Sequence, residues 1–253
     1  MLGLVIGDIV ASVYAFKPIK SRNFEFFDIN GKFTDDTVLA AGVANAMGAY
    51  QEDHNLNFSE ILQEELLRIS WVYQDMAYSR FFSQWMFEDE PKPYGSAGIV
   101  AASRALPIGF QGSSLEEVEQ LAKLSAAITH SHEEGLKGAQ CAAGCVFLAK
   151  QGKSKEDILA YAKKYYDLSF TLASIRSQYQ YIPTCPYALP PAIISFMEAE
   201  GFEEALRNVI FIGGGDSMAA ITGALSEAFY GVPEELAKTA RNYLDEEILS
   251  ALD

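Results

Sequence analysis

Thr34-Asp35-Asp36-Thr37 lies near the N-terminus of this chain of 253 residues, and Gly213-Gly214-Gly215-Asp216-Ser217 follows about 180 residues later. Each stretch stands where an apolar helical pattern begins. Carboxylates and hydroxyls in the first turns of two helices can meet at one point, and they are the oxygen ligands that a hard cation such as Mg²⁺ binds. The two stretches therefore predict one metal site built from both ends of the chain.

Each stretch also has a simpler interpretation as the start of a helix. Thr34 is a good N-cap, and acidic residues in a first turn interact favourably with the helix dipole. The glycines before Asp216 allow a sharp turn and the close approach of a ligand. Helix capping explains either stretch alone about as well as a metal does, and only the two together favour the metal site.

The composition limits the partners of the protein. Its 19 Lys and Arg residues against 34 Asp and Glu residues give a net charge of −15, which argues against nucleic acid as a partner. The apolar start, Met1–Phe16, lacks a basic flank and is interrupted by Asp8, so it is interpreted as a buried helix, and no membrane partner is expected. Three scattered cysteines (Cys141, Cys145 and Cys185) argue against a disulfide framework and favour the cytoplasm.

Apolar periodicity is helical almost throughout and predicts one all-α domain over residues 1–253. Only Phe24–Phe33 alternates weakly, as a short hairpin or an aromatic-rich loop would. The expected helices are Leu2–Ala15, Asp35–Tyr50, Ser59–Gln74, Tyr78–Phe87, Ser96–Ala105, Leu115–Thr129, Gly135–Lys150, Lys155–Tyr166, Pro191–Ala199, Phe202–Ile210, Ser217–Tyr230 and Pro233–Leu244.

Two of the three histidines, His130 and His132, lie close together between two expected helices. Metal binding by this pair would need a third strong ligand that the sequence does not show. The alternative is that both rings form hydrogen bonds at a helix junction, and taken alone the stretch favours that alternative by about two to one.

Several motifs, in the same order along the chain, resemble those of the ADP-ribosylglycohydrolases. The resemblance covers nearly the whole length, and Phe33-Thr34-Asp35-Asp36-Thr37 is identical to the first metal motif of that family. The other stretches are Gly7-Asp8-Ile9-Val10, Pro91-Lys92-Pro93-Tyr94, Arg104-Ala105-Leu106-Pro107-Ile108-Gly109, Thr129-His130-Ser131-His132-Glu133-Glu134-Gly135, and Asp216-Ser217 followed by Ala219-Ala220-Ile221-Thr222-Gly223.

The resemblance implies a compact orthogonal bundle of helices with two Mg²⁺ ions in a cleft. It implies hydrolysis of a glycosidic bond between ADP-ribose and a modified protein or a small molecule, through an oxocarbenium-like state. The ions would orient the ribose hydroxyls and a water. The implied metal ligands are Thr34, Asp35, Asp36, Asp216 and Ser217, with Asp35 and Asp36 as the catalytic carboxylates. The implied substrate-binding residues are Asp8, Gly98, His130, His132 and Gly213.

Two departures from the family pattern remove carboxylates. Where family members usually carry a Glu beside an aromatic residue, this chain has Tyr14-Ala15-Phe16, and Ala15 can neither transfer a proton nor position a water. The second metal motif of the family has two Asp residues, and the ungapped alignment places Asp216 on the second and Gly214 on the first. An alternative alignment deletes two residues and makes Asp216 the first Asp, and it also loses one carboxylate. One ion should then bind weakly or not at all, and restoring Glu at 15 and Asp at 214 would be expected to raise activity.

Two further departures change the ligand loop and its surroundings. Gly98-Ile99-Val100 replaces a Gly-Asn-Gly stretch with bulkier apolar residues. Cys185-Pro186-Tyr187 stands where many members have a polar stretch, and Pro186 lacks an amide donor.

Three hypotheses follow from the motifs and their departures. The chain is a Mg²⁺-dependent glycohydrolase with weakened activity, or a catalytically inactive relative that binds a cation or an ADP-ribose-like ligand, or a purely structural or interaction protein. The fold can be shared by all three, because fold and site are separable.

Overall fold

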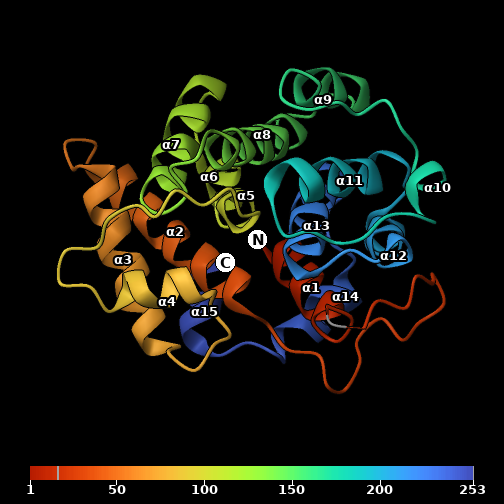
Figure 1. Cartoon of the computed structure of the whole chain (residues 1–253), viewed down its shortest axis with the longest axis horizontal. Coiled ribbons are helices and arrows are strands. Elements are labelled where there is room, and N and C mark those ends of the chain that lie inside the picture. The colour runs from red at the N-terminus through yellow and green to blue at the C-terminus, as the bar shows by residue number, and fades with distance from the viewer. Residues whose placement is uncertain (16, 253) are drawn as a thin grey trace.

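Helices form the regular structure of the described residues, 1–15 and 17–252, in this computed structural model (Figure 1). Within those residues, backbone pairing of the strand type is limited to an isolated bridge between Gly98 and Thr184. The helices are α1 (Leu2–Ser12), α2 (Asp35–Glu52), α3 (Phe58–Val72), α4 (Arg80–Met86), α5 (Val100–Ser103), α6 (Leu106–Gln111), α7 (Leu115–Ala127), α8 (Glu133–Lys150), α9 (Lys155–Ala162), α10 (Leu172–Ile175), α11 (Cys185–Met197), α12 (Phe202–Ile212), α13 (Asp216–Tyr230), α14 (Glu234–Arg241) and α15 (Glu246–Leu252). The all-α prediction is confirmed.

Local signals explain where most helices begin. The Thr34 side chain accepts a hydrogen bond from the Asp36 amide at the start of α2, and Ser114 caps α7 in the same way. Ser154 and Asp157 form a reciprocal capping box at α9. The segment from residue 17 to 34 is neither helix nor strand, so Phe24–Phe33 is the aromatic-rich loop rather than the hairpin.

The prediction that a helix begins at Pro191 was wrong, because α11 already begins at Cys185 and runs through Pro190 and Pro191. Proline lacks the amide that a helix interior needs, so propensity alone would end a helix there. Burial outweighs this cost, since both prolines and the flanking Leu189 are buried.

The helix expected over Ser96–Ala105 is also corrected: it begins only at Val100, and α6 follows it. Tertiary contacts hold the first residues outside the helix. The Gly98 amide donates to Oγ of Ser96, and the Ile99 amide donates to the carbonyl of Pro183. The short helices α6, α10 and α15 were not expected.

Two hydrophobic clusters form the core on either side of the central helices. One gathers around α1, α11, α12 and α13, and the other around α2, α3, α6 and α7, while α8 contributes to both. Figure 1 shows α1 and α13 side by side, with α2 and α3 on one flank and α11 and α12 on the other. Together they form a single compact domain.

Small residues let α1 and α13 approach at backbone distance. A Cβ atom at Gly7 would lie 2.0 Å from the carbonyl oxygen of Ala219, and one at Gly223 would lie 2.0 Å from that of Gly3. These glycines are therefore required by packing and not by a turn. The contact aligns the residue after Gly7, which is Asp8, with the first turn of α13.

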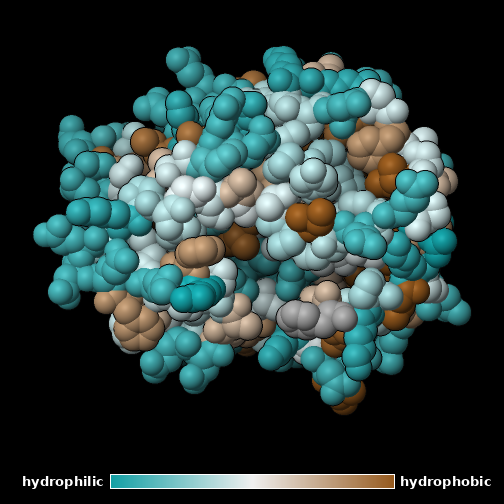
Figure 2. Space-filling model, in the orientation of Figure 1, coloured by the Kyte–Doolittle hydropathy of each residue, from teal (hydrophilic) through white to brown (hydrophobic). Residues whose placement is uncertain are grey.

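The surface is mainly polar, as the view in Figure 2 shows for one face. Across the described residues, the helices are too short or too polar to cross a lipid bilayer. The three cysteines are free thiols, and all are buried.

Replacing Gly7 with Ala should therefore destabilise the protein, because the new methyl group overlaps the backbone of α13. We expect a loss of at least about 1–3 kcal/mol in the free energy of unfolding, measured by urea denaturation. Gly48→Ala in α2 is the matched control: a Cβ there meets nothing within 4 Å, so helix propensity should make it stabilising by about 0.5–1 kcal/mol. Equal effects of the two substitutions would contradict the packing argument.

Candidate functional site

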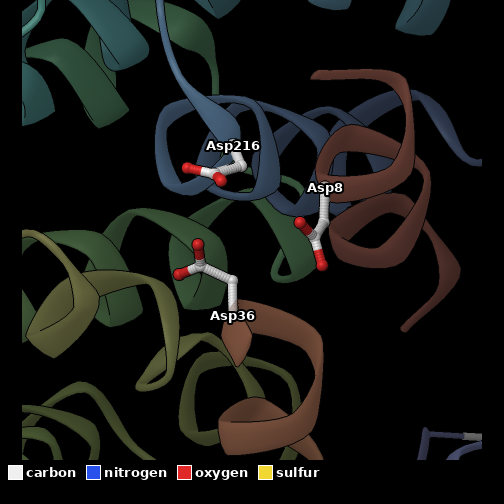
Figure 3. Close-up of side chains that lie close together, drawn as sticks. All are labelled: Asp8, Asp36 and Asp216. Atoms are coloured by element: carbon white, nitrogen blue, oxygen red, sulfur yellow. The ribbon is translucent and has the colours of Figure 1, made fainter. Parts of the chain in front are cut away.

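Three carboxylates from distant parts of the chain meet at the centre of the molecule. Asp8 comes from α1, Asp36 from the first turn of α2 and Asp216 from the first turn of α13, and Figure 3 shows them facing a common space. One oxygen of each lies within 4.8 Å of the others. Asp8 and Asp36 are buried. The predicted convergence of the two ends of the chain is present, and Asp8 is part of it.

Asp8 holds the first metal motif in place. One of its carboxylate oxygens accepts a hydrogen bond from the Thr34 hydroxyl at 2.7 Å. The other accepts from the Thr34 amide at 2.7 Å and from the Thr37 hydroxyl at 2.5 Å. Asp8 therefore fixes both threonines of the motif against α1.

Two hydroxyl groups hold Asp36. Ser217 donates to one carboxylate oxygen at 2.7 Å, and Ser103 of α5 donates to the other. Ser217 thus joins the two predicted metal motifs directly. Ser103 was missed by the sequence analysis, although a single hydroxyl in the apolar run before Arg104 was a usable signal.

Burial raises the pKa values of these carboxyl groups, and repulsion from neighbouring carboxylates adds to this for Asp8, Asp35 and Asp36. Burial, and then the charge of Asp216, raises the pKa of Asp8 to about 7. Burial, and then the charges of Asp8 and Asp216, raises the pKa of Asp35 to about 7. Burial and the neighbouring Asp residues raise the pKa of Asp36 well above its usual range, and burial raises that of Asp216.

This arrangement suits a cation. Ion pairs among the described residues involve other carboxylates, so the cluster is not neutralised by Lys, Arg or His. Uncompensated buried charge is costly, and a divalent ion with oxygen ligands would remove that cost. The donor set, which consists of carboxylates and hydroxyls, fits Mg²⁺ and lacks the sulfur or imidazole typical of zinc sites.

A pocket of about 180 Å³ adjoins the cluster at Asp35. Aromatic rings form part of its walls: the rings of Phe81 and Tyr94 stack with 5.9 Å between centroids, and Tyr94 lies 5.7 Å from the His130 ring. Gly98 also lines the pocket, and a Cβ there would lie 3.1 Å from Nε2 of His130. Asp35, Gly98 and His130, three of the predicted site residues, thus line one pocket.

The two predicted histidines have different surroundings. His130 is buried, and its Nδ1 lies 2.7 Å from the Thr129 hydroxyl. Burial, and then the charge of Arg104, lowers the pKa of His130 well below its usual range, so the ring is neutral. His132 is exposed at the N-cap of α8, where Nδ1 accepts from the Glu134 amide at 3.1 Å.

The remaining predicted residue, Gly213, ends α12 with a left-handed backbone (φ 83°). A Cβ there would lie 3.0 Å from Cε of Lys20. Gly213 thus begins the turn that leads to Asp216, and it packs against the segment that follows α1.

Three of the four departures from the family pattern lie at or near the pocket and α1. Ile99 is fully buried in the core, and Val100 lines the pocket. The Cys185 thiol donates to the Gly98 carbonyl at 3.4 Å, so it helps to hold the loop that contains Gly98 in place. Ala15 lies just beyond α1, and its neighbour Phe16 lies outside the described residues.

Comparison with known proteins gives a consistent result. A family model described as ADP-ribosylglycohydrolase matches residues 1–252. ADP-ribosylhydrolase ARH3 of Gallus gallus is 26% identical over 258 aligned positions, covering 79% of this chain and 70% of that protein. ARH3 of Homo sapiens is 26% identical over 207 positions, covering 62% of this chain and 57% of that protein.

Among solved structures, an "ADP-ribosylglycohydrolase-related protein complex" is similar to this chain with a TM-score of 0.69. The match covers 100% of this chain and 90% of that one at 21% sequence identity, which supports the fold.

The carboxylate cluster should make the metal-free protein sensitive to pH. Because the folded pKa values of Asp8 and Asp35 are raised to about 7, the folded state binds more protons than the unfolded state between about pH 4 and 7, and stability falls as pH rises through 7. In chelator, we expect Tm to be lower at pH 8 than at pH 5.5 by at least about 2–4 °C, which corresponds to about 1 kcal/mol.

Asp36→Asn should reduce the decrease in Tm between pH 5.5 and pH 8, because it removes one charge from the cluster. Asp89→Asn, which removes an exposed carboxylate, is the control and should leave the pH dependence unchanged. A metal-free protein whose Tm rises between pH 5.5 and pH 8 would show that the cluster is not repulsive.

Proposed function

This chain belongs to the ADP-ribosylglycohydrolase family, and from that premise we propose that it hydrolyses a glycosidic bond between ADP-ribose and a protein side chain or a small molecule. The observation that carries the proposal is the meeting of Asp8, Asp36 and Asp216 beside a pocket with aromatic walls. Such a site combines a place for a cation with a place for a flat ring system.

The proposed cofactor is Mg²⁺, with Asp36 and Asp216 as its central ligands and Thr34, Asp35 and Ser217 around it. When bound, the ion would supply charge that orients ribose hydroxyls and the attacking water. Asp8 would position Thr34 through the hydrogen bonds it accepts from that residue.

The reaction breaks the bond between the anomeric carbon of the ribose and the nitrogen or oxygen of the leaving group. The oxygen of water forms the new bond to that carbon, one proton of the water goes to the leaving group, and the transition state carries oxocarbenium character. Negative charge from Asp35 and Asp36 would stabilise the developing positive charge on the sugar. Asp35 also borders the pocket and can hold the water.

We propose that the aromatic pocket receives the nucleoside half of the ligand. Phe81 and Tyr94 would contact a base through their rings, and neutral His130 with Gly98 would form its polar side. His132 and Gly213 do not line this pocket, so any contact they make would be with parts of the ligand that extend beyond it.

The proposed setting is the cytoplasm, in keeping with three free, buried thiols. The proposed partners are an ADP-ribosylated protein or an ADP-ribose-containing small molecule. A net charge of −15 argues against binding to nucleic acid.

A second candidate function is that of an inactive relative that binds a cation or an ADP-ribose-like ligand. The absence of an acidic side chain at Ala15 favours it, because a methyl group can neither transfer a proton nor position a water. Catalytic groups act together, so the loss of one can abolish activity while leaving binding intact.

The first test is release of free ADP-ribose from ADP-ribosyl-arginine and ADP-ribosyl-serine substrates, with Mg²⁺ and with a chelator. We expect release in the presence of Mg²⁺ and none in the presence of the chelator. In Asp36→Asn, the rate of release should decrease by at least about 100-fold, because the substitution removes a central carboxylate. Asp89→Asn should match the wild type. If the folded protein releases nothing but still binds ADP-ribose, the inactive-relative function replaces the proposed one.

The pocket can be tested separately from the chemistry. Phe81→Ala removes an aromatic wall and should raise KM by about 5- to 10-fold with little change in kcat, as expected for a contact made equally in the ground and transition states. Phe87→Ala, which removes an equally exposed ring near the end of the same helix and outside the pocket, is the matched control. An equal effect of both substitutions would contradict the assignment of the pocket.

A further inference from the structure

We infer that this chain holds one divalent cation, not two, because the turn before Asp216 directs position 214 away from the carboxylate cluster. The inference rests on the proposed function only in assuming that the cluster binds a cation at all. It follows from the backbone of the turn and from what packs against it.

The turn between α12 and α13 is a Schellman motif. Gly213 has a left-handed backbone, and its amide donates to the carbonyl of Ile210 at 3.0 Å. The Gly214 amide donates to the carbonyl of Val209 at 2.9 Å. In this motif, the residue after the left-handed one contacts the last turn of the helix that is ending.

The contacts of Gly214 agree with that expectation. A Cβ at this position would lie 2.6 Å from Cγ1 of Val209 and 3.0 Å from Cε of Met218. A carboxylate at 214 would therefore enter the packed contact between α12 and α13 and would not face Asp36. The expectation that Asp at 214 restores a ligand is not supported by this backbone.

Tyrosine side chains hold the turn in this conformation. A Cβ at Gly215 would lie 2.4 Å from Cε1 of Tyr181, so the ring lies directly on the turn. The Tyr179 hydroxyl donates to Sδ of Met218 at 3.1 Å, and Nζ of Lys20 donates to the Tyr179 carbonyl at 2.8 Å. Moving residue 214 toward the cluster would disrupt these contacts.

The carboxylates that remain are sufficient for one ion. Oxygens on opposite sides of a Mg²⁺ ion lie about 4.2 Å apart, twice the usual Mg–O distance. Those of Asp8, Asp36 and Asp216 lie within 4.8 Å of one another, so small side-chain movements would bring them to a common ion. Asp8 thereby takes the place of the carboxylate missing at Gly214, in addition to its hydrogen bonds to the threonines.

The test counts bound ions directly. Mn²⁺ is titrated into the chelator-treated protein, and free Mn²⁺ is followed by electron paramagnetic resonance. We expect one Mn²⁺ per chain at saturation. Asp36→Asn should weaken its binding by at least about tenfold, because a metal ligand is lost.

Gly214→Asp is the decisive variant, and it should still bind one Mn²⁺ while its Tm falls. Gly201→Asp is its matched control, because it also adds one carboxylate but a Cβ at Gly201 meets nothing within 4 Å. This variant should keep both the ion count and the Tm of the wild type. If Gly214→Asp does not fold, the count in the wild type remains the test.

Two Mn²⁺ ions bound to the wild type, a second ion gained by Gly214→Asp, or no Mn²⁺ bound would each overturn the inference. One ion in a protein that releases no ADP-ribose would support the inference and remove the hydrolase function. Two ions in an active protein would support the hydrolase function and overturn the inference of a single ion.

Discussion

The close contact between α1 and α13 is the constraint on which the site depends. Gly7 allows the two backbones to meet, and Asp8 follows it in α1 while Asp216 begins α13. A contact at backbone distance leaves little freedom for one helix to slide past the other. The core therefore fixes the separation of two carboxylates that are 208 residues apart in the sequence, and α2 adds the third through its cap at Thr34.

The same arrangement stores electrostatic repulsion in the folded protein. Asp8, Asp36 and Asp216 are held close together by hydroxyl groups and helix packing, and none of the ion pairs among the described residues links one of them to a basic residue. A bound cation would convert this repulsion into attraction and so would stabilise the fold. The proposed function would then be coupled to stability through the same carboxyl groups.

Much of this could be predicted from the sequence, because the signals were local. Helical periodicity and the Thr34 cap predicted the fold class, and the two acidic stretches predicted where the ends of the chain meet. The contribution of Tyr181 could not be predicted, since this residue carries no signal until tertiary packing brings it to the site, whereas the lone hydroxyl of Ser103 in its apolar run was a usable signal. The direction of residue 214 depends on the hydrogen bonds of a turn, and the extension of α11 through Pro190 depends on burial; neither can be determined from residue type.

The most direct test of the central claim, that three carboxylates from α1, α2 and α13 form one cation site, is a crystal structure with Mn²⁺ and its anomalous difference map. The account predicts a single peak within coordination distance of carboxylate oxygens of Asp8, Asp36 and Asp216. Two peaks in the cleft, or a peak that contacts other residues and leaves these three carboxylates unliganded, would contradict it.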